Sequence, residues 1–559
     1  MGGACETPIS LFLEALMSAL LRTISILSVV LVAACSNTAG EAAPTGKCGP
    51  DTTPCTAPPY ADSEWTSIHA TSRNNDYVET TIAQRYEKKW KVLEGVATVM
   101  GPSIGPEGNL YISAPSLKGT SALYAFNSDG DELWKSEPWN GPEDLDSCAG
   151  YQTPIIDTEG DVYVGDCNQL WSFTADGTLR WAVDLPDPPA GAAWQTIDAA
   201  PVNSFVTGFF SKDGSVGGIT IWGDIVLVSR TDGSSVAPAM KMPGSVSVSD
   251  DELPEGLGIE PPPGLWQPDF MDQDMISPIW YVFDGVTPGA NTPAVEPNSG
   301  RIFATGFSEA LDDDLGALYG FDFEPGEPGE LGTIEVGLTF VMGPGSGSSP
   351  GITADGSTVY VSDGEGMLYS VDAKTGEENW STQTGGQPAS PSVGPDGKIY
   401  LLGGNAGSSY NPDGSEAWVA NLDAIAETLV PPLDPDSILT GPTTFNNAIP
   451  TITDSGILTT VTVGYEFFLG RQAPVPVMQI VILLDADTGE PVEGHEFFEV
   501  DDTVDGFVIP SLEGTIYVNQ GALASSTIST VSMLFEGDLP DGVTVMQPIG
   551  GLQAYTPAP

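Results

Sequence analysis

One motif recurs along most of this 559-residue chain and restricts its fold more than any other feature. Each copy begins with a proline that precedes a small or polar residue and an aliphatic residue. A short β-branched or aromatic strand follows, then a strand of the type Leu-Tyr-x-Phe, a glycine turn and often a tryptophan. Four short strands separated by turn residues are typical of one blade of a β-propeller.

The first copy shows the order of these parts. Pro102-Ser103-Ile104 precedes a strand that ends at Ile112, and the second strand, the turn and the tryptophan follow at 122–126, Asp129-Gly130 and Trp134. The Asp-Gly turn supplies the positive φ that a tight hairpin needs. The eight copies begin at Pro102, Pro154, Pro201, Pro293, Pro350, Pro391, Pro450 and Pro510. We therefore predict an all-β, eight-bladed propeller; Pro201 is the weakest start because Asn203 replaces the usual aliphatic residue.

The intervals between starts predict where the ring carries extra chain. The interval from Pro350 to Pro391 matches a bare blade, whereas that from Pro201 to Pro293 is about twice as long. The surplus, around residues 236–275, is rich in proline, glycine, serine and acidic residues. It is typical of a long loop over one face rather than of a separate domain.

A ring of blades must also close. Residues 86–92 resemble the last strand of a blade, because Trp90 occupies the place that Trp134, Trp181 and Trp380 take after their turns. If this strand pairs with the C-terminal blade, it completes the circle and covers both free edges.

Residues 86–550 resemble the PQQ-like propeller repeat of the quinoprotein dehydrogenases. That resemblance implies PQQ held with Ca²⁺ above a central tryptophan. The vicinal cysteine pair of those enzymes is absent here, and there is no CxxCH haem motif. We expect Trp134 and Trp181 to pack between blades, and we predict no cofactor, with Ca²⁺ as the open alternative.

Catalytic residues are hard to select because acidic residues are so common. Runs such as Asp312-Asp313-Asp314 and Asp501-Asp502 fit loop solvation, with Ca²⁺ binding or paired-carboxylate catalysis as alternatives. Asn127-Ser128-Asp129-Gly130-Asp131 resembles a calcium loop but falls on a hairpin turn. The two histidines, His69 and His495, are too distant in sequence to favour a Ser-His-Asp triad. His69 lies in a polar stretch that either packs the lead-in to the ring or folds across a propeller face.

The N-terminus predicts export and lipid attachment. An apolar run at residues 24–32, too short to span a bilayer, leads into Val32-Ala33-Ala34-Cys35. This resembles a lipobox, so Cys35 is the predicted lipid-bearing residue; ordinary cleavage after Ala34 is the alternative. We assign residues 1–34 to a signal peptide whose true start could be Met17. A linker at 35–63, a lead-in at 64–85 and the propeller at 86–559 follow, and Ser36 favours the outer membrane.

Four further cysteines agree with an oxidising compartment. Cys48, Cys55, Cys148 and Cys167 allow three pairings, of which the local one, Cys48–Cys55 with Cys148–Cys167, is preferred. A metal site is the rival interpretation, but there is no CxxC. Disulfides are more usual in exported proteins.

The charge balance restricts the partners. The formal net charge is −59, from 76 acidic and 17 basic residues, which repels nucleic acids and anionic lipids. Lipid anchor, tether and eight-bladed ring together resemble the lipoprotein of the outer-membrane β-barrel assembly machinery. We therefore expect a non-catalytic scaffold at the cell envelope that binds proteins and meets the membrane only through its anchor. The alternative is an exported oxidoreductase, hydrolase or lyase with its site in the central funnel; the sequence sets no oligomeric state.

Overall fold

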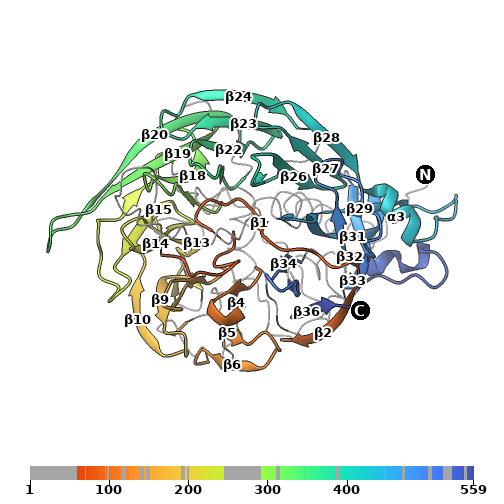
Figure 1. Ribbon diagram of the computed structural model, residues 1–559, viewed down its shortest axis with the longest axis horizontal. Coiled ribbons are helices and arrows are strands. Elements are labelled where there is room, and N and C mark those ends of the chain that lie inside the picture. Colours follow the sequence, from red (N-terminus) through yellow and green to blue (C-terminus); the bar gives the residue numbers. More distant parts are fainter. Residues whose placement is uncertain are drawn as a thin grey trace, which may run out of the picture.

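The structure is a computed structural model in which eight β-sheets surround one axis (Figure 1). It describes residues 59–69, 71–94, 96, 98, 100–114, 121–138, 144–145, 152–189, 196–197, 200–244, 291–309, 315–345, 348–384, 389–446, 449–468, 472–500, 506–519, 532–546 and 551–559. The predicted eight-bladed propeller is confirmed. Each blade runs from an innermost strand at the axis to an outermost strand at the rim.

The first four blades each hold four antiparallel strands in chain order. They are β3 (Ser103–Ile104), β4 (Leu110–Ser113), β5 (Leu123–Phe126) and β6 (Glu132–Lys135); β7 (Ile155–Ile156), β8 (Val162–Gly165), β9 (Gln169–Phe173) and β10 (Leu179–Asp184); β13 (Phe205–Phe210), β14 (Val216–Thr220), β15 (Asp224–Val228) and β16 (Met240–Lys241); and β17 (Ala294–Val295), β18 (Ile302–Phe307), β19 (Leu315–Glu324) and β20 (Thr333–Pro344). A 3₁₀ turn, η1 (Pro106–Gly108), and a separate strand pair, β11 (Thr196–Ile197) with β12 (Ala200–Pro201), lie between these strands.

Blades five and six repeat this plan, and blade seven enlarges it. Blades five and six are β21 (Gly351–Ile352), β22 (Thr358–Ser362), β23 (Met367–Asp372) and β24 (Glu378–Gln383), and β25 (Ser392–Val393), β26 (Ile399–Gly403), β27 (Ala406–Tyr410) and β28 (Glu416–Asn421). Blade seven comprises β30 (Thr451–Thr453), β31 (Gly456–Phe468), β32 (Gln472–Leu484) and β33 (Phe498–Val500), with β1 (Tyr77–Val78) and β29 (Thr440–Phe445) added. Helix α3 (Asp423–Leu429) and the 3₁₀ segment η4 (Met533–Asp538) contribute side chains to the core of this blade.

The eighth blade closes the ring with strands from both ends of the described chain. β34 (Val508–Pro510), β35 (Ile516–Asn519) and β36 (Leu552–Pro557) are followed at the rim by β2 (Tyr86–Val92), which pairs antiparallel with β36 from Tyr86–Pro557 to Val92–Leu552. The predicted closure strand is therefore confirmed. Both seam edges are paired, which removes two edges that could bind other chains.

Two of the eight predicted starts are misplaced. Pro201 lies on β12, whereas the innermost strand of blade three is β13; in blade eight Pro510 ends the innermost strand instead of preceding it. Proline fits both kinds of position because each strand has an edge where no ladder N–H is needed. The predicted insertion lies mostly outside the described residues, although its first part supplies β16.

Tryptophans on outermost strands dock a blade on the next one at five junctions of the ring. Each indole N–H donates to a carbonyl in the neighbouring hairpin turn: Trp90 to Ser128 (3.0 Å), Trp134 to Ala175 (2.9 Å), Trp181 to Arg230 (3.1 Å), Trp380 to Pro412 (2.9 Å) and Trp418 to Ala486 (3.0 Å). The ring of each tryptophan covers the glycine of that turn, where a Cβ would lie 2.5–3.0 Å from the indole. The expected packing role of Trp134 and Trp181 is what the structure shows.

Candidate functional site

The chain's own residues 60–80, here called the hub segment, run over the inner ends of the blades (Figure 1, in red to orange). Innermost strands face the axis with one unpaired edge, and backbone groups on such an edge need partners. Six of these strands donate an N–H to a carbonyl of the hub segment: Ile104 to Trp65 (2.5 Å), Ile156 to Thr66 (3.1 Å), Val295 to Ser72 (2.6 Å), Ile352 to Arg73 (2.8 Å), Val393 to Asn75 (3.1 Å) and Ile452 to Asp76 (2.6 Å).

The remaining two blades are held by side chains of the same segment. The Tyr60 hydroxyl accepts the N–H of Phe210 in blade three (3.4 Å), and the Glu64 carboxylate accepts the N–H of Leu512 in blade eight (3.0 Å). Strand β1 continues the contact by pairing parallel with β30 of blade seven. One stretch of about twenty residues thus contacts all eight blades, and its contacts begin within the predicted linker.

His69, the residue that the sequence singled out, lies buried in this segment with no exposed surface. Burial lowers its pKa well below the ordinary value because the charged imidazolium would be desolvated. The polar stretch around His69 lies across the inner ends of the blades, which agrees with the alternative in which this stretch folds across a propeller face. A buried neutral imidazole is suited to packing rather than to proton exchange with a substrate.

Asp76 ends the row of hub carbonyls and is also fully buried. Burial raises its pKa well above the ordinary value, and a hydrogen bond from Ser392 opposes that rise. Asp76 and Asn74 both adopt left-handed backbone conformations, at φ 59° and 51°. Asn and Asp tolerate this region better than other non-glycine residues, so the polar composition of the stretch suits its curved path.

The other histidine, His495, lies elsewhere. It precedes β33 in blade seven, its ring is 6.5 Å from that of Tyr86, and partial burial lowers its pKa. The structure therefore places the two histidines on separate parts of the fold. The calcium-like loop is a hairpin turn in which the Asn127 side-chain oxygen accepts the N–H groups of Asp129 and Asp131.

Several predicted site residues lie outside the described residues: Cys35, Cys48, Cys55, Cys148, Asp312-Asp313-Asp314 and Asp501-Asp502. Cys167 is described; it is fully buried and disulfide-bonded. Its pairing with Cys148 remains a prediction. Within the described ranges, no cluster of three or more His, Cys, Asp or Glu side chains is arranged to hold a metal ion, and no helix is long and apolar enough to cross a membrane.

An ionic network between blades two and three was not predicted from the sequence. Asp157 accepts from Arg230 (2.6 Å), the Tyr163 hydroxyl (2.8 Å) and two backbone N–H groups. Arg180 pairs with Asp161 (2.6 Å) and also donates to Tyr163. The sequence signal that could have predicted it is the rarity of basic residues. With 17 basic and 76 acidic residues, each arginine or lysine is expected to lie near more than one carboxylate.

Comparison with known proteins places this arrangement in context. Residues 294–443, which span blades four to six, match the family model described as outer membrane protein assembly factor BamB. The proteins of that name from Burkholderia pseudomallei (strain K96243) and Yersinia pestis are 35% identical over 97 and 83 residues, which is 17% and 14% of this chain. The matches span only 25% and 21% of the length of those relatives.

Solved structures that align with this chain include two dehydrogenases and an assembly factor. A europium-containing methanol dehydrogenase aligns with a TM-score of 0.47 at 12% identity, covering 88% of this chain and 98% of that one. BamB from Moraxella catarrhalis gives 0.40 at 11% (84% and 100%), and a quinohemoprotein alcohol dehydrogenase from Pseudomonas putida HK5 gives 0.49 at 13% (90% and 81%). The chain is an eight-bladed β-propeller, and its blades four to six match the PQQ-like repeat of this family model.

Proposed function

We propose that this protein is a lipid-anchored scaffold of the cell envelope that binds protein partners on the outer surface of its ring. The observation that carries the proposal is the hub segment, whose carbonyls between Trp65 and Asp76 accept hydrogen bonds from the innermost strands of six blades, so the chain's own backbone occupies these inner strand edges. The hydrogen bonds of the hub segment go to the inner ends of the blades, so the proposal assigns partners to the rim strands and hairpins. The relatives named as outer membrane protein assembly factors support the same role.

The acidic surface favours partners with basic patches. Acidic residues outnumber basic ones by 76 to 17, so opposite charge would speed association and select among partners. The predicted lipid at Cys35 would hold the ring near the membrane, and the predicted linker would let it reach partners there.

The test is a crosslinking capture from membranes of cells that produce the lipidated protein, with Cys35→Ala as the matched unanchored form. The proposal expects stable partners that are captured with the anchored form and depleted with the Cys35→Ala form. Absence of any stable partner for the anchored protein would count against a scaffold. Soaking with Ca²⁺ and PQQ examines the enzymatic alternative, which requires binding in the central funnel.

A further inference from the structure

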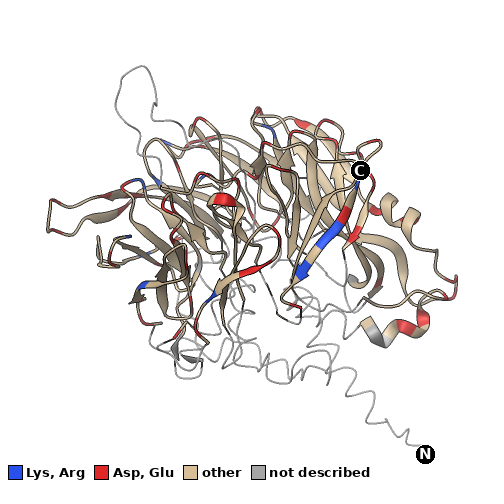
Figure 2. Cartoon of the chain, turned by 60° about the horizontal axis from the view of Figure 1, so that its bottom comes forward, with Lys and Arg blue, Asp and Glu red and all other residues tan. Residues whose placement is uncertain are grey.

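The rim of blade four differs from every other rim. Its outermost strand β20 has 12 residues, whereas the other outermost strands have two to seven. With β19 it forms a hairpin that projects from the ring (Figures 1 and 2). In the part of the chain that the structure describes, β20 pairs as a strand with β19 alone. At its C-terminal end the Gly343 N–H donates to the Tyr369 hydroxyl (3.1 Å) and the Pro344 carbonyl accepts the Gly364 N–H (2.7 Å), both in blade five, so the open edge is the part of β20 before Gly343.

This edge lacks the usual protection. Edge strands are commonly guarded by charged side chains, prolines or short length, because their unpaired N–H and C=O groups attract other strands. β20 carries one charged residue, Glu335, and its proline is its last residue. Three large hydrophobic side chains are exposed on or just before it: Leu331 (55%), Val336 (37%) and Val341 (45%).

The exposure has a structural cause in the neighbouring blade. Val336 and Val341 lie opposite Phe321 and Ala317, which belong to the hydrophobic core that blade four shares with blade three. Blade three ends at the rim in β16, only two residues long, and no tryptophan docking joins these two blades among the described residues. The face of β20 that blade three would cover is therefore left open.

Blade seven shows how the same chain covers a long hairpin elsewhere. Its strands β31 and β32 have 13 residues each, and β29 pairs along β31 while α3 and η4 pack against that blade's core. Nothing comparable lies along β20 in the described residues. The chain therefore covers the long hairpin of blade seven with its own elements, whereas the described residues leave the long hairpin of blade four uncovered.

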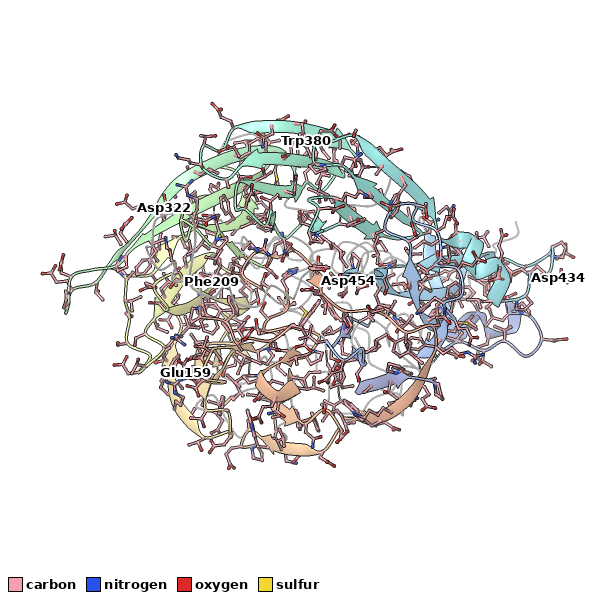
Figure 3. All side chains as sticks on the ribbon, in the orientation of Figure 1. Glu159, Phe209, Asp322, Trp380, Asp434 and Asp454 are labelled. Carbon is pink, nitrogen blue, oxygen red and sulfur yellow. The ribbon has the colours of Figure 1, made fainter. Side chains whose placement is uncertain are left out.

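The charge around β20 selects the kind of partner. Glu324, Glu327, Glu330 and Glu335 are exposed on the hairpin, and there is no lysine or arginine from residue 302 to 373. Asp322, at the base of the hairpin (Figure 3), is neutralised by Arg301 at 2.7 Å. The chain's own residues 245–290 contain nine acidic and no basic residues, so like charge disfavours them as the occupant, and a second copy of the chain carries the same excess of acid.

Resting on the proposed scaffold role, we propose that β20 is a docking edge for an extended segment of a partner protein in which basic residues alternate with apolar ones. The segment adds a strand antiparallel or parallel to β20. Backbone hydrogen bonds provide affinity, the apolar residues cover Val336 and Val341, and the basic residues meet the glutamates. Alternation is required because successive residues of a strand point to opposite faces.

The test uses a blocked, fluorescent peptide of about ten alternating lysine and valine residues and the full chain. Fluorescence anisotropy gives Kd, and hydrogen exchange reports the amides of 333–344. Val336→Glu/Val341→Glu is expected to weaken binding about ten-fold or more. Leu133→Glu/Leu179→Glu, which places two glutamates at exposed positions of β6 and β10, is the matched control and should bind like the wild type. A glutamate–valine peptide should not bind, and a lysine–glycine peptide should bind weakly without protecting β20.

Other results would overturn the inference. Equal binding by the two double variants, or protection outside β20, places the peptide elsewhere. If the amides of β20 exchange slowly without peptide and this protection is lost when residues 245–290 are removed, the edge is occupied by the chain's own segment. If the protein forms a concentration-dependent dimer that Val336→Glu/Val341→Glu abolishes, the edge is occupied by a second copy of the chain. Capture of envelope partners equally by the wild type and Val336→Glu/Val341→Glu leaves the scaffold role standing without this edge. Peptide binding with no captured partner has the opposite meaning: the edge stands and the scaffold role fails.

Discussion

The contact between Trp380 and the turn of blade six predicts how far tryptophan docking stabilises the ring. Gly414 has φ 83°, and a Cβ there would lie 2.6 Å from Cδ2 of Trp380. Gly414→Ala combines the cost of a left-handed alanine, about 1–2 kcal/mol, with overpacking of about 1–3 kcal/mol. Gly108→Ala is the matched control, because Gly108 also has a positive φ (73°) and its Cβ would meet nothing within 4 Å.

The measurement is urea unfolding followed by circular dichroism. Gly414→Ala should lower the free energy of unfolding by about 1–3 kcal/mol more than Gly108→Ala does, since only the first displaces the indole. In a Trp380→Ala background this excess should vanish, because the clash is gone. Equal losses at the two glycines, or an excess that persists without Trp380, would refute docking as the reason for glycine at this turn.

Four further predictions concern hydrogen bonds and buried charges. Trp134→Phe keeps an aromatic ring but removes the pyrrole N–H that donates to Ala175, together with part of the packing on Gly177, so it should cost at least about 1 kcal/mol in urea unfolding; an unchanged midpoint would deny the contact a role. Asp157→Ala removes the buried carboxylate that pairs with Arg230 and leaves Arg230 with the exposed Glu159 (3.1 Å) and the Gly214 carbonyl (2.7 Å), so it should cost about 1–3 kcal/mol. A loss no larger than that of an exposed aspartate would contradict the network. Because the folded pKa of His69 is lowered, the folded state binds fewer protons than the unfolded state below about pH 6.5. Stability is thus lost as the pH falls through that range, and His69→Gln should flatten the dependence. The raised pKa of Asp76 has the opposite sign, so stability is lost as the pH rises above about 3.9; Asp76→Asn should flatten that limb, and unchanged pH profiles would refute both assignments.

The sequence predicted most of the blades because their information is local. Turn glycines, alternating strands and the tryptophan after each turn all lie within one repeat, so the closure strand could be recognised from Trp90 alone. Pro201 and Pro510 misled because proline is tolerated at more than one edge position of a strand. The edge of β20 escaped notice because its exposure depends on how early the rim strand of blade three ends, which is a property of the neighbouring repeat.

The hub segment could not be predicted in detail for a related reason. Its partners lie from Ile104 to Leu512, and no periodicity in residues 60–80 encodes contacts at such separations. The need to satisfy backbone hydrogen bonds explains where the hub segment and β2 lie. Inner strand edges must be satisfied at the axis, and the hub segment provides the acceptors; the seam must be satisfied, and β2 provides its pairing. Among the described residues, the rim edges are the strand edges that neither the hub segment nor β2 covers, and seven of the eight rim strands have seven residues or fewer. The same requirement that explains the hub thus points to β20 as the edge whose partner lies outside the chain.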